Sequence, residues 1–173
     1  MCIRDRLTAV RSGELRGALW SEIDEKAAEW RIPAARMKMR EAHIVPLSTQ
    51  ALAILSELRT LTGNREHLFP NVAKPTAPMS ENAVLFALYR MGYHGRATGH
   101  GFRTTFSTIL NEQGFAPDWI ERQLAHKERN AVRAAYHRAT YLPERRKLMQ
   151  HWGDYLAAVE KGAEVISFRR NVA

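Results

Sequence analysis

The strongest constraint on the fold of this chain is a change of hydrophobic pattern at Ser48. Before it, residues 20–48 contain three short segments rich in aromatic or β-branched residues, "WSEID", "AEWRIPA" and "AHIVPLS", separated by polar stretches. Such segments predict the strands of a small antiparallel sheet. After Ser48 the apolar residues recur mostly at helical spacing. The sequence therefore predicts a mainly α-helical fold with a small antiparallel β-sheet near the N-terminus.

Capping residues mark the boundaries of the first two helices expected after the sheet. Ser48 or Thr49 can cap "QALAILSELRTLTG", and Gly63 is placed to end that helix. Ser80 can cap "ENAVLFALYRMG", which Gly92 is placed to end. The Pro-rich "HLFPNVAKPTAPM" between them predicts a loop.

Four further helices are expected in the second half of the chain. "GHGFRTTFSTIL" begins one that should end near Gly114, and "PDWIERQLAH" begins another with Pro117 at its first helical position. "NAVRAAYHRATY" and "PERRKLMQHWGDYLAAVEKG" predict the last two.

The two ends of the chain differ from the rest. Near the start, "LTAVRSGELRGAL" has no N-cap residue before it and reads as the middle of a helix, so the chain looks truncated. We interpret residues 1–6 as a truncated or non-native start, residues 7–160 as one domain, and the basic residues 161–173 as a flexible tail.

The amino-acid composition indicates which kind of partner the protein binds and in which cellular compartment it is found. The chain has 26 Lys and Arg residues against 18 Asp and Glu residues, a net charge of +8, which favours nucleic acid or another polyanion as partner. Cys2 is the only cysteine, so we expect no disulfide and no thiolate metal site, whereas a site built from histidines stays open. No apolar run approaches the roughly 20 residues that cross a bilayer. We therefore expect a soluble, intracellular protein without a membrane partner.

The helix that begins "GHGFRTTFSTIL" combines an apolar stripe with polar residues on a neighbouring face. The apolar residues recur at the i, i+4, i+7, i+8 spacing of a helix packed into a core: Phe102, Phe106, Ile109 and Leu110. His100, Arg103 and Ser107 lie beside them. An arginine next to such a stripe implies a structural carboxylate or an anionic ligand, because a buried arginine is rarely left without a partner.

Taken singly, the polar residues of interest have ordinary structural interpretations. Arg11 can be a surface helix residue, and Lys38, in the loop between the second and third strands, can be a solvated hairpin charge. His100 can cap a helix, His126 can be a hydrogen-bonded core histidine, and Tyr136 can be a core aromatic residue. Their order and local sequence favour a shared function instead.

In their order, these motifs resemble those of the tyrosine recombinases, the phage-integrase family, and most closely the prophage and genomic-island integrases with a "GHGFR" box. The resemblance covers residues 7 to about 158 and rests on "TAVRSGELRGALWSEID", "MKMREAHIVPL", "HGFR", "LAH" and "AAYHR". Many relatives have Leu-Gly-His where this chain has "LAH", which leaves the histidine intact. The site residues that the resemblance implies are Arg11, Glu14, Lys38, His100, Arg103, His126 and Tyr136.

The roles implied for these residues suit the attack on a phosphodiester. Two arginine forks, Arg11 and Arg103, can hold the non-bridging oxygens of the transition state, with Glu14 supporting Arg11. Tyr136 would be the nucleophile, its proton passing to His100, Glu14 or solvent. Lys38, on a mobile hairpin, would give a proton to the leaving 5′ oxygen. By resemblance, His126 hydrogen-bonds the scissile phosphate.

The resemblance implies the tyrosine-recombinase catalytic-domain fold of DNA breaking-rejoining enzymes. We expect a site-specific recombinase that works through a 3′-phosphotyrosyl intermediate and integrates and excises a mobile element. No cofactor or metal is needed in this scheme. The substrate would be double-stranded DNA that carries attachment sites. The full-length protein would bind it as a homotetramer, in the bacterial cytoplasm at the nucleoid. A type IB topoisomerase-like activity and a non-catalytic, truncated DNA-binding remnant are the alternatives.

Overall fold

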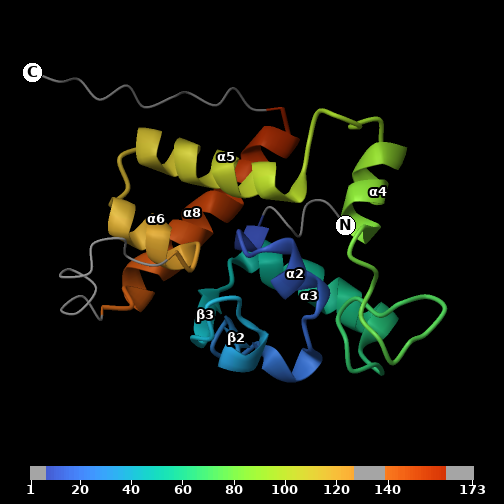
Figure 1. Cartoon of the computed structure of the whole chain (residues 1–173). Helices are drawn as coiled ribbons and strands as arrows, with labels where there is room; N and C mark the ends of the chain where they lie inside the picture. Colours follow the sequence, from blue (N-terminus) through green and yellow to red (C-terminus); the bar gives the residue numbers. More distant parts are fainter. Residues whose placement is uncertain (1–6, 127–138, 163–173) are drawn as a thin grey trace, which may run out of the picture.

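The computed structural model describes residues 7–126 and 139–162. After the short helix α2 its elements follow the order expected from the hydrophobic pattern, with the strands before Ser48 and helices after it (Figure 1). Within the described ranges, the bounds are α2 Ser12–Arg16, β1 Ile23–Asp24, β2 Glu29–Ile32, β3 His43–Pro46, α3 Thr49–Thr62, α4 Ala83–Arg90, α5 Gly99–Glu112, α6 Pro117–Gln123 and α8 Leu142–Glu160. Two 3₁₀ turns, η1 Trp20–Glu22 and η2 Ala34–Arg36, flank the first two strands.

The predicted sheet is confirmed as three antiparallel strands in the order β1-β2-β3. Trp30 of β2 lies opposite Ile23 on one side and Val45 on the other. Trp30 and Val45 are buried, whereas Arg31, the next residue of β2, is exposed. One face of the sheet therefore packs on the core. The connection from β2 to β3 carries Lys38, as predicted.

Local sequence explains the helix boundaries. The Ser48 hydroxyl accepts a hydrogen bond from the Ala51 amide at 3.2 Å, which identifies Ser48 as the cap of α3, and Gly63 is its C-cap residue. The Thr98 hydroxyl caps α5 in the same way, accepting from the Gly101 amide at 3.0 Å. Pro117 is at the first position of α6, as expected.

Two of the helix predictions need correction. The helix expected through "LTAVRSGELRGAL" is interrupted: Leu7 and Thr8 are helical, Ala9 has a φ of +53°, and the helix resumes only as the five-residue α2. Arg11 is the N-cap residue of α2, and its amide donates to the Glu14 carboxylate at 2.9 Å. Further along, α4 starts at Ala83 and not directly after Ser80, since the Ala83 amide is taken by the Ser80 carbonyl in a preceding turn.

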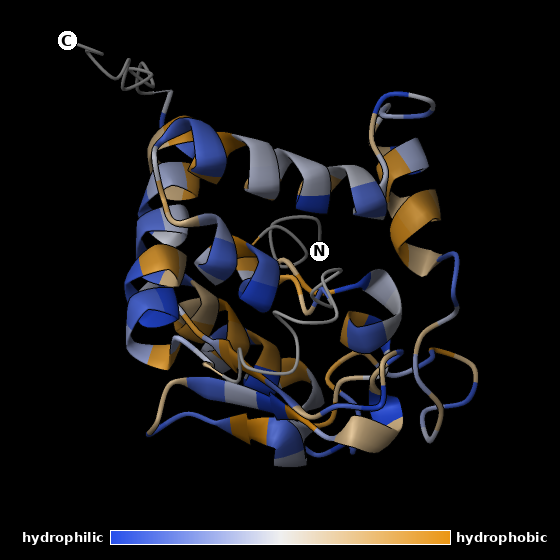
Figure 2. Ribbon diagram, turned by 60° about the vertical axis from the view of Figure 1, so that its left-hand side comes forward, coloured by the Kyte–Doolittle hydropathy of each residue, from blue (hydrophilic) through white to orange (hydrophobic). Residues whose placement is uncertain are grey.

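Two hydrophobic clusters form the core. The first joins the sheet and α3 to one side of α4. The second joins α5, α6 and α8, with Phe106, Leu110, Ile120 and Leu148 fully buried. Figure 1 shows α5, α6 and α8 on one side of the molecule and the sheet on the other. The edge helix α4 is hydrophobic along much of its length (Figure 2), and its Phe86 is half exposed.

The chain segment that precedes Arg11 passes between the two clusters. Leu7 and Val10 belong to the first cluster and Ala9 to the second, and all three are buried. Arg11 therefore emerges where the clusters meet, held from both sides by apolar packing.

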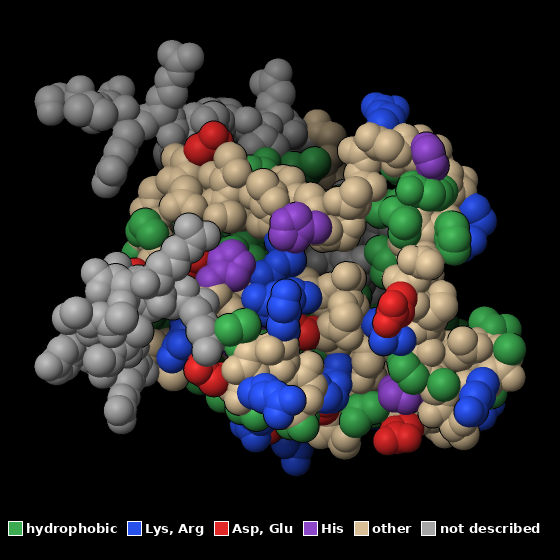
Figure 3. Space-filling view, viewed as in Figure 1, with side chains coloured by type: hydrophobic (Ala, Val, Ile, Leu, Met, Phe, Trp, Pro, Cys, Tyr) green, Lys and Arg blue, Asp and Glu red, His purple; other side chains and the backbone are tan. Residues whose placement is uncertain are grey.

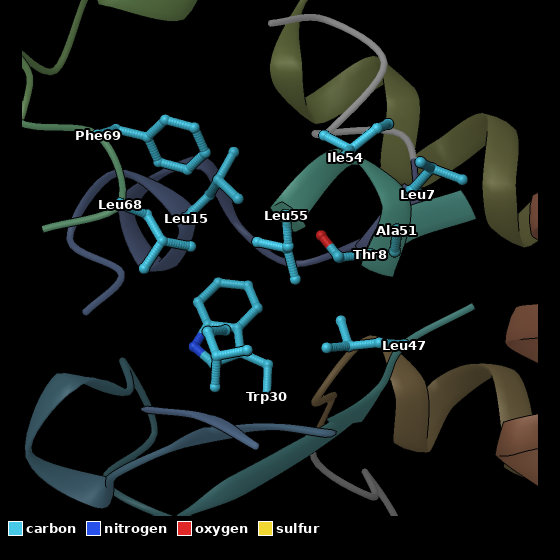
Figure 4. A pocket seen from close by; sticks show the side chains of 11 residues that line it. Leu7, Thr8, Leu15, Trp30, Leu47, Ala51, Ile54, Leu55, Leu68 and Phe69 are labelled. Carbon is cyan, nitrogen blue, oxygen red and sulfur yellow. The ribbon is translucent and has the colours of Figure 1, made fainter. Parts of the chain in front are cut away.

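A small cavity remains inside the first cluster (Figure 4). Its walls are almost entirely apolar, with Trp30, Leu47 and Leu55 among them, and the Thr8 hydroxyl has no hydrogen-bond partner within the described residues. A cavity of this kind is a packing defect of the core, because ligand sites need several converging polar groups. The functional site must be sought elsewhere. None of the helices in the described part of the chain has the length and apolar character needed to cross a membrane.

Candidate active site

Arg11 is held in place by a single carboxylate. Its Nη1 donates to Glu14 Oε1 at 2.9 Å, while its backbone amide donates to the other oxygen of Glu14, also at 2.9 Å. Its Nη2 reaches the carbonyl of Ala125 at 3.2 Å, more than a hundred residues along the chain. The Glu14 side chain is 4% exposed and that of Arg11 27%. Glu14 thus binds Arg11 through both of its oxygens, and part of the guanidinium stays open to solvent.

Arg103 is buried one turn into α5, with 6% of its surface exposed. It donates to two backbone carbonyls, those of Ala9 and of Leu124, the latter at 2.7 Å. Burial, and then the nearby charge of Arg11, lower the pKa of Arg103 to about 10, so it remains charged at neutral pH. No carboxylate in the described ranges forms an ion pair with it. Two cations therefore lie near each other, and the carboxylates of Glu14 and Glu121 are close enough to act on the charge of Arg103.

His126 completes this group from the turn after α6. Its Nε2 lies 3.2 Å from Arg103 Nη2, and its Nδ1 lies 2.7 Å from Glu121 Oε2. A guanidinium can only donate, so Nε2 accepts and Nδ1 carries the proton donated to Glu121. Ala125, with a φ of +50°, turns the chain so that its carbonyl faces Arg11 and the next side chain faces Arg103. Such backbone strain in a non-glycine residue is common at functional sites.

His100 lies on the first turn of α5, three residues before Arg103, and its side chain is exposed. Residues at this spacing share a helix face, so His100 borders the arginine pair. Figure 3 shows Lys, Arg and His side chains gathered below α5 near the middle of this face of the molecule. The N-terminal end of α5 also favours an anion there, through its free amides and dipole.

Lys38 approaches the same region from the sheet. It is exposed in the β2–β3 connection, and its side chain has no hydrogen bond to the described residues. Its neighbours Met37 and Met39 line one pocket together with Ala125 and His126. The β2–β3 connection that carries Lys38 and the turn after α6 therefore line the same pocket.

The structure thus pairs Arg11 with Glu14 and Arg103 with His126, links Arg11 to the Ala125 carbonyl next to His126, and places His100 and Lys38 at the border of that group. Tyr136, the predicted nucleophile, lies outside the described residues. All of these roles remain predictions, since proximity alone does not identify a catalytic group.

A buried polar junction behind the site was not predicted from the sequence. Gln123, at the end of α6, is fully buried and donates through Nε2 to the Thr8 carbonyl at 3.1 Å. Its Oε1 accepts from Arg145 Nη2 of α8 at 2.8 Å, and Arg145 also donates to the Ile44 carbonyl of β3. The only hint in the sequence is a glutamine within the apolar pattern of "WIERQLAH".

His43 of β3 joins this junction through the Gln123 carbonyl, to which its Nε2 donates at 3.1 Å. Burial, and then the charge of Arg145, lower the pKa of His43 to about 3. A neutral histidine and a charged arginine therefore tie β3, α6 and α8 together directly behind the arginine pair.

The comparisons with known proteins agree with this arrangement. The model of the Phage integrase family matches residues 6–142. The prophage integrase IntA of Escherichia coli (strain K12) is 50% identical over 161 residues, covering 93% of this chain and 39% of that protein. The chain thus spans about two fifths of the length of that curated relative.

Solved structures agree at the level of the fold. The crystal structure of XerA recombinase matches with a TM-score of 0.60 and 16% identity, covering 91% of this chain and 55% of the other. A lambda integrase dimer bound to a COC′ core site matches with a TM-score of 0.54 and 19% identity, covering 80% and 51%. The fold is therefore that of the tyrosine recombinase catalytic domains, as expected from the motifs. Given a family match over most of its length and a relative half identical to it, the chain belongs to the phage integrase family.

Proposed function

We propose that this chain is the catalytic domain of a site-specific DNA recombinase that integrates and excises a mobile element. The observation that carries the proposal is the buried Arg103, which has backbone carbonyls but no carboxylate as partners within the described residues and lies beside Arg11. A buried cation without an ion pair costs free energy in the empty site. A DNA phosphate would offset that cost by supplying the missing negative charge.

The proposed reaction gives each of the predicted site residues one role. The Tyr136 hydroxyl oxygen attacks the scissile phosphorus, the bond from phosphorus to the 5′ oxygen breaks, and a 3′-phosphotyrosyl link forms. Arg11 and Arg103 hold the non-bridging oxygens, and His126, whose Nε2 faces Arg103, donates a further hydrogen bond to the phosphate when that nitrogen carries a proton. Preorganised donors of this kind are each worth about 10²–10³ in rate. Attack by the 5′ hydroxyl of a partner strand reverses the step and rejoins the DNA.

Two protons must move during cleavage. Both oxygens of Glu14 already hold Arg11, which favours His100 or solvent over Glu14 as acceptor of the Tyr136 proton. The leaving 5′ oxygen takes its proton from the Lys38 ammonium, which a residue on an exposed connection can deliver into the site.

The substrate we propose is double-stranded DNA carrying attachment sites, which suits the net charge of +8 and the core-site DNA bound by lambda integrase. We further propose that the full-length protein acts as a homotetramer on DNA at the bacterial nucleoid. Since two arginines neutralise the phosphate, cleavage should not depend on a divalent metal ion.

The test is covalent capture of DNA. The chain is incubated with a nicked duplex from the end of the mobile element that encodes it, and a denaturing gel is used to detect a protein–DNA adduct. Tyr136→Phe should form no adduct, because it loses only the nucleophilic oxygen. Tyr141→Phe, five residues further on, is the matched control and should react normally.

If Tyr136→Phe still formed an adduct and Tyr141→Phe did not, the nucleophile would be Tyr141 instead. If the unaltered chain formed no adduct, a non-catalytic remnant would be favoured. The same gel run in excess EDTA tests metal independence, which a loss of adduct restored by added metal would contradict. Strand exchange between two labelled duplexes, rather than relaxation of a supercoiled plasmid, separates a recombinase from a topoisomerase.

A further inference from the structure

Arg36 connects two parts of the candidate site that are far apart in sequence. We propose that Arg36 is a positioning residue for Lys38, a role that rests on the proposed function. It lies in η2, two residues before Lys38, and it holds the start of the lysine connection against the turn that carries Arg11.

The contacts of Arg36 define this link. Its Nη1 forms an ion pair with Glu22 Oε2, and its Nη2 donates to the Glu14 carbonyl, 22 residues earlier in the chain. Glu14 is the residue whose carboxylate holds Arg11. One guanidinium thus links the β2–β3 connection that carries Lys38 to the short helix α2 that begins at Arg11. It can do so because its planar fork presents several donors.

Glu22 is a firm anchor for this fork. Its side chain is 6% exposed, and the same Oε2 also accepts from Trp30 Nε1 at 2.9 Å and from the Leu19 amide at 3.3 Å. Gly17 leaves room on the other side, since a Cβ there would come within 3.1 Å of Arg36 Nη2. The guanidinium is therefore enclosed between fixed groups and has little freedom to move.

The residue between Arg36 and Lys38 strengthens the argument. Met37 is buried in the first hydrophobic cluster, and it lines the pocket shared with Ala125 and His126. The backbone of the connection is thus fixed immediately before Lys38. Because the exposed Lys38 side chain has no hydrogen bond to the described residues, the point from which it reaches the DNA is set by Arg36 and Met37.

This role predicts a defect confined to one chemical step. In the proposed reaction Lys38 gives a proton to the 5′ oxygen as its bond to phosphorus breaks. If a sulfur atom replaces that bridging oxygen, the group leaves as a thiolate without a proton, because a thiol has a pKa of only about 8.5. A misplaced Lys38 should therefore slow cleavage of the oxygen substrate and spare the sulfur substrate.

The experiment measures single-turnover adduct formation by the whole 173-residue chain on two nicked duplexes, one with bridging oxygen and one with bridging 5′ sulfur. Arg36→Gln should slow the oxygen duplex by about 10–10²-fold, the range expected for a misplaced acid. It should slow the sulfur duplex less than about threefold, since no acid is needed there. Lys38→Ala should give the same pattern and serves as reference.

Two further variants make the result specific. Arg40→Gln removes a positive charge from the same connection, where the Arg40 side chain makes no ion pair within the described residues, so both rates should stay close to those of the unaltered chain. Arg36→Lys keeps the charge but cannot bridge Glu22 and the Glu14 carbonyl, so its sulfur-to-oxygen rate ratio should rise as in Arg36→Gln. The ratio of the sulfur to the oxygen cleavage rate does not depend on the fraction of protein that is folded. If Arg36→Gln does not fold, the same ratio can be measured with Arg36→Lys.

An unchanged ratio in both Arg36 variants would overturn the role of Arg36 while leaving the proposed function intact. A failure of the unaltered chain to form an adduct with either duplex would overturn the proposed function, and the role of Arg36 with it.

Discussion

Arg11 and Arg103 lie in contrasting environments although both are proposed to bind the same phosphate. Arg11 is partly exposed and paired with Glu14, whereas Arg103 is buried and, among the described residues, donates to backbone carbonyls and His126. The first is oriented by a carboxylate and the second by main-chain geometry. A phosphate bound between them would meet one cation in an ion pair and one that forms none within the described residues.

The fork of Arg11 gives a prediction at the residue scale. Arg11→Lys should lower the cleavage rate by about 10²-fold or more, because an ammonium cannot bind Glu14, the Ala125 carbonyl and a phosphate in one plane. Adduct formation on the nicked duplex measures the effect. Arg16→Lys, the same substitution on the same short helix, is the control and should cleave normally. Near-normal cleavage by Arg11→Lys would make Arg11 a structural residue.

At the scale of elements, the site depends on how α6 is held. The carbonyls of Leu124 and Ala125 and the side chain of His126 all follow the end of this helix, and each contacts one of the two arginines. The buried junction of Gln123 with Arg145 and His43 fixes that end against α8 and β3. The polar junction therefore sets the position of three groups of the site.

His43 makes this junction sensitive to acid. In the unfolded chain a histidine takes up a proton below its ordinary pKa of 6.5, whereas in the fold the pKa of His43 is about 3 because of burial and the charges of Arg145, Arg122 and Arg103. Its contribution to stability is therefore complete above pH 6.5 and is lost as the pH falls toward 3. The loss should approach about 1.4 kcal/mol per pH unit.

Urea unfolding between pH 7.5 and 4 measures this dependence. His43→Gln keeps a donor for the Gln123 carbonyl but does not titrate, so its free energy of unfolding should fall less steeply over the same range. Equal slopes for the two proteins would show that His43 is already accessible to protons in the folded chain.

At the scale of the whole molecule, the site forms where the two hydrophobic clusters meet. The segment before Arg11 touches both clusters, Arg103 comes from the second, and the Lys38 connection is anchored in the first through Met37. A change that shifts one cluster against the other would therefore move Lys38 relative to Arg103. The geometry of the site thus depends on the packing of both clusters.

The positive charge of the molecule predicts how the chain binds DNA. The contacts proposed here are to phosphates, which carry no sequence information directly. The 173-residue chain should therefore bind attachment-site and scrambled duplexes with similar dissociation constants, roughly 10⁻⁴–10⁻⁶ M at physiological salt, and much more weakly as salt increases. Titration of both duplexes across a salt series measures this. Nanomolar binding that discriminates between them at moderate salt would contradict it.

The amino-acid sequence by itself predicted most of the elements and singled out the candidate site residues. The three strands, the caps at Ser48 and Pro117 and the placement of Lys38 between two strands follow from local rules that act over a few residues. The motifs likewise singled out Arg103 and His126, which the fold brings into contact, and Arg11, whose guanidinium reaches the Ala125 carbonyl beside them. The place of Tyr136 stays a prediction.

Only the tertiary structure decided how these residues are held. The short α2, the ligands of Arg103 and the links made by Arg36 and Gln123 were not evident in the sequence. The physical reason is that Arg103, Arg36 and Gln123 each bind a backbone carbonyl, which every residue type possesses, so no pattern of side chains marks these contacts. Which carbonyl lies within reach of a buried guanidinium is settled only when distant segments pack together.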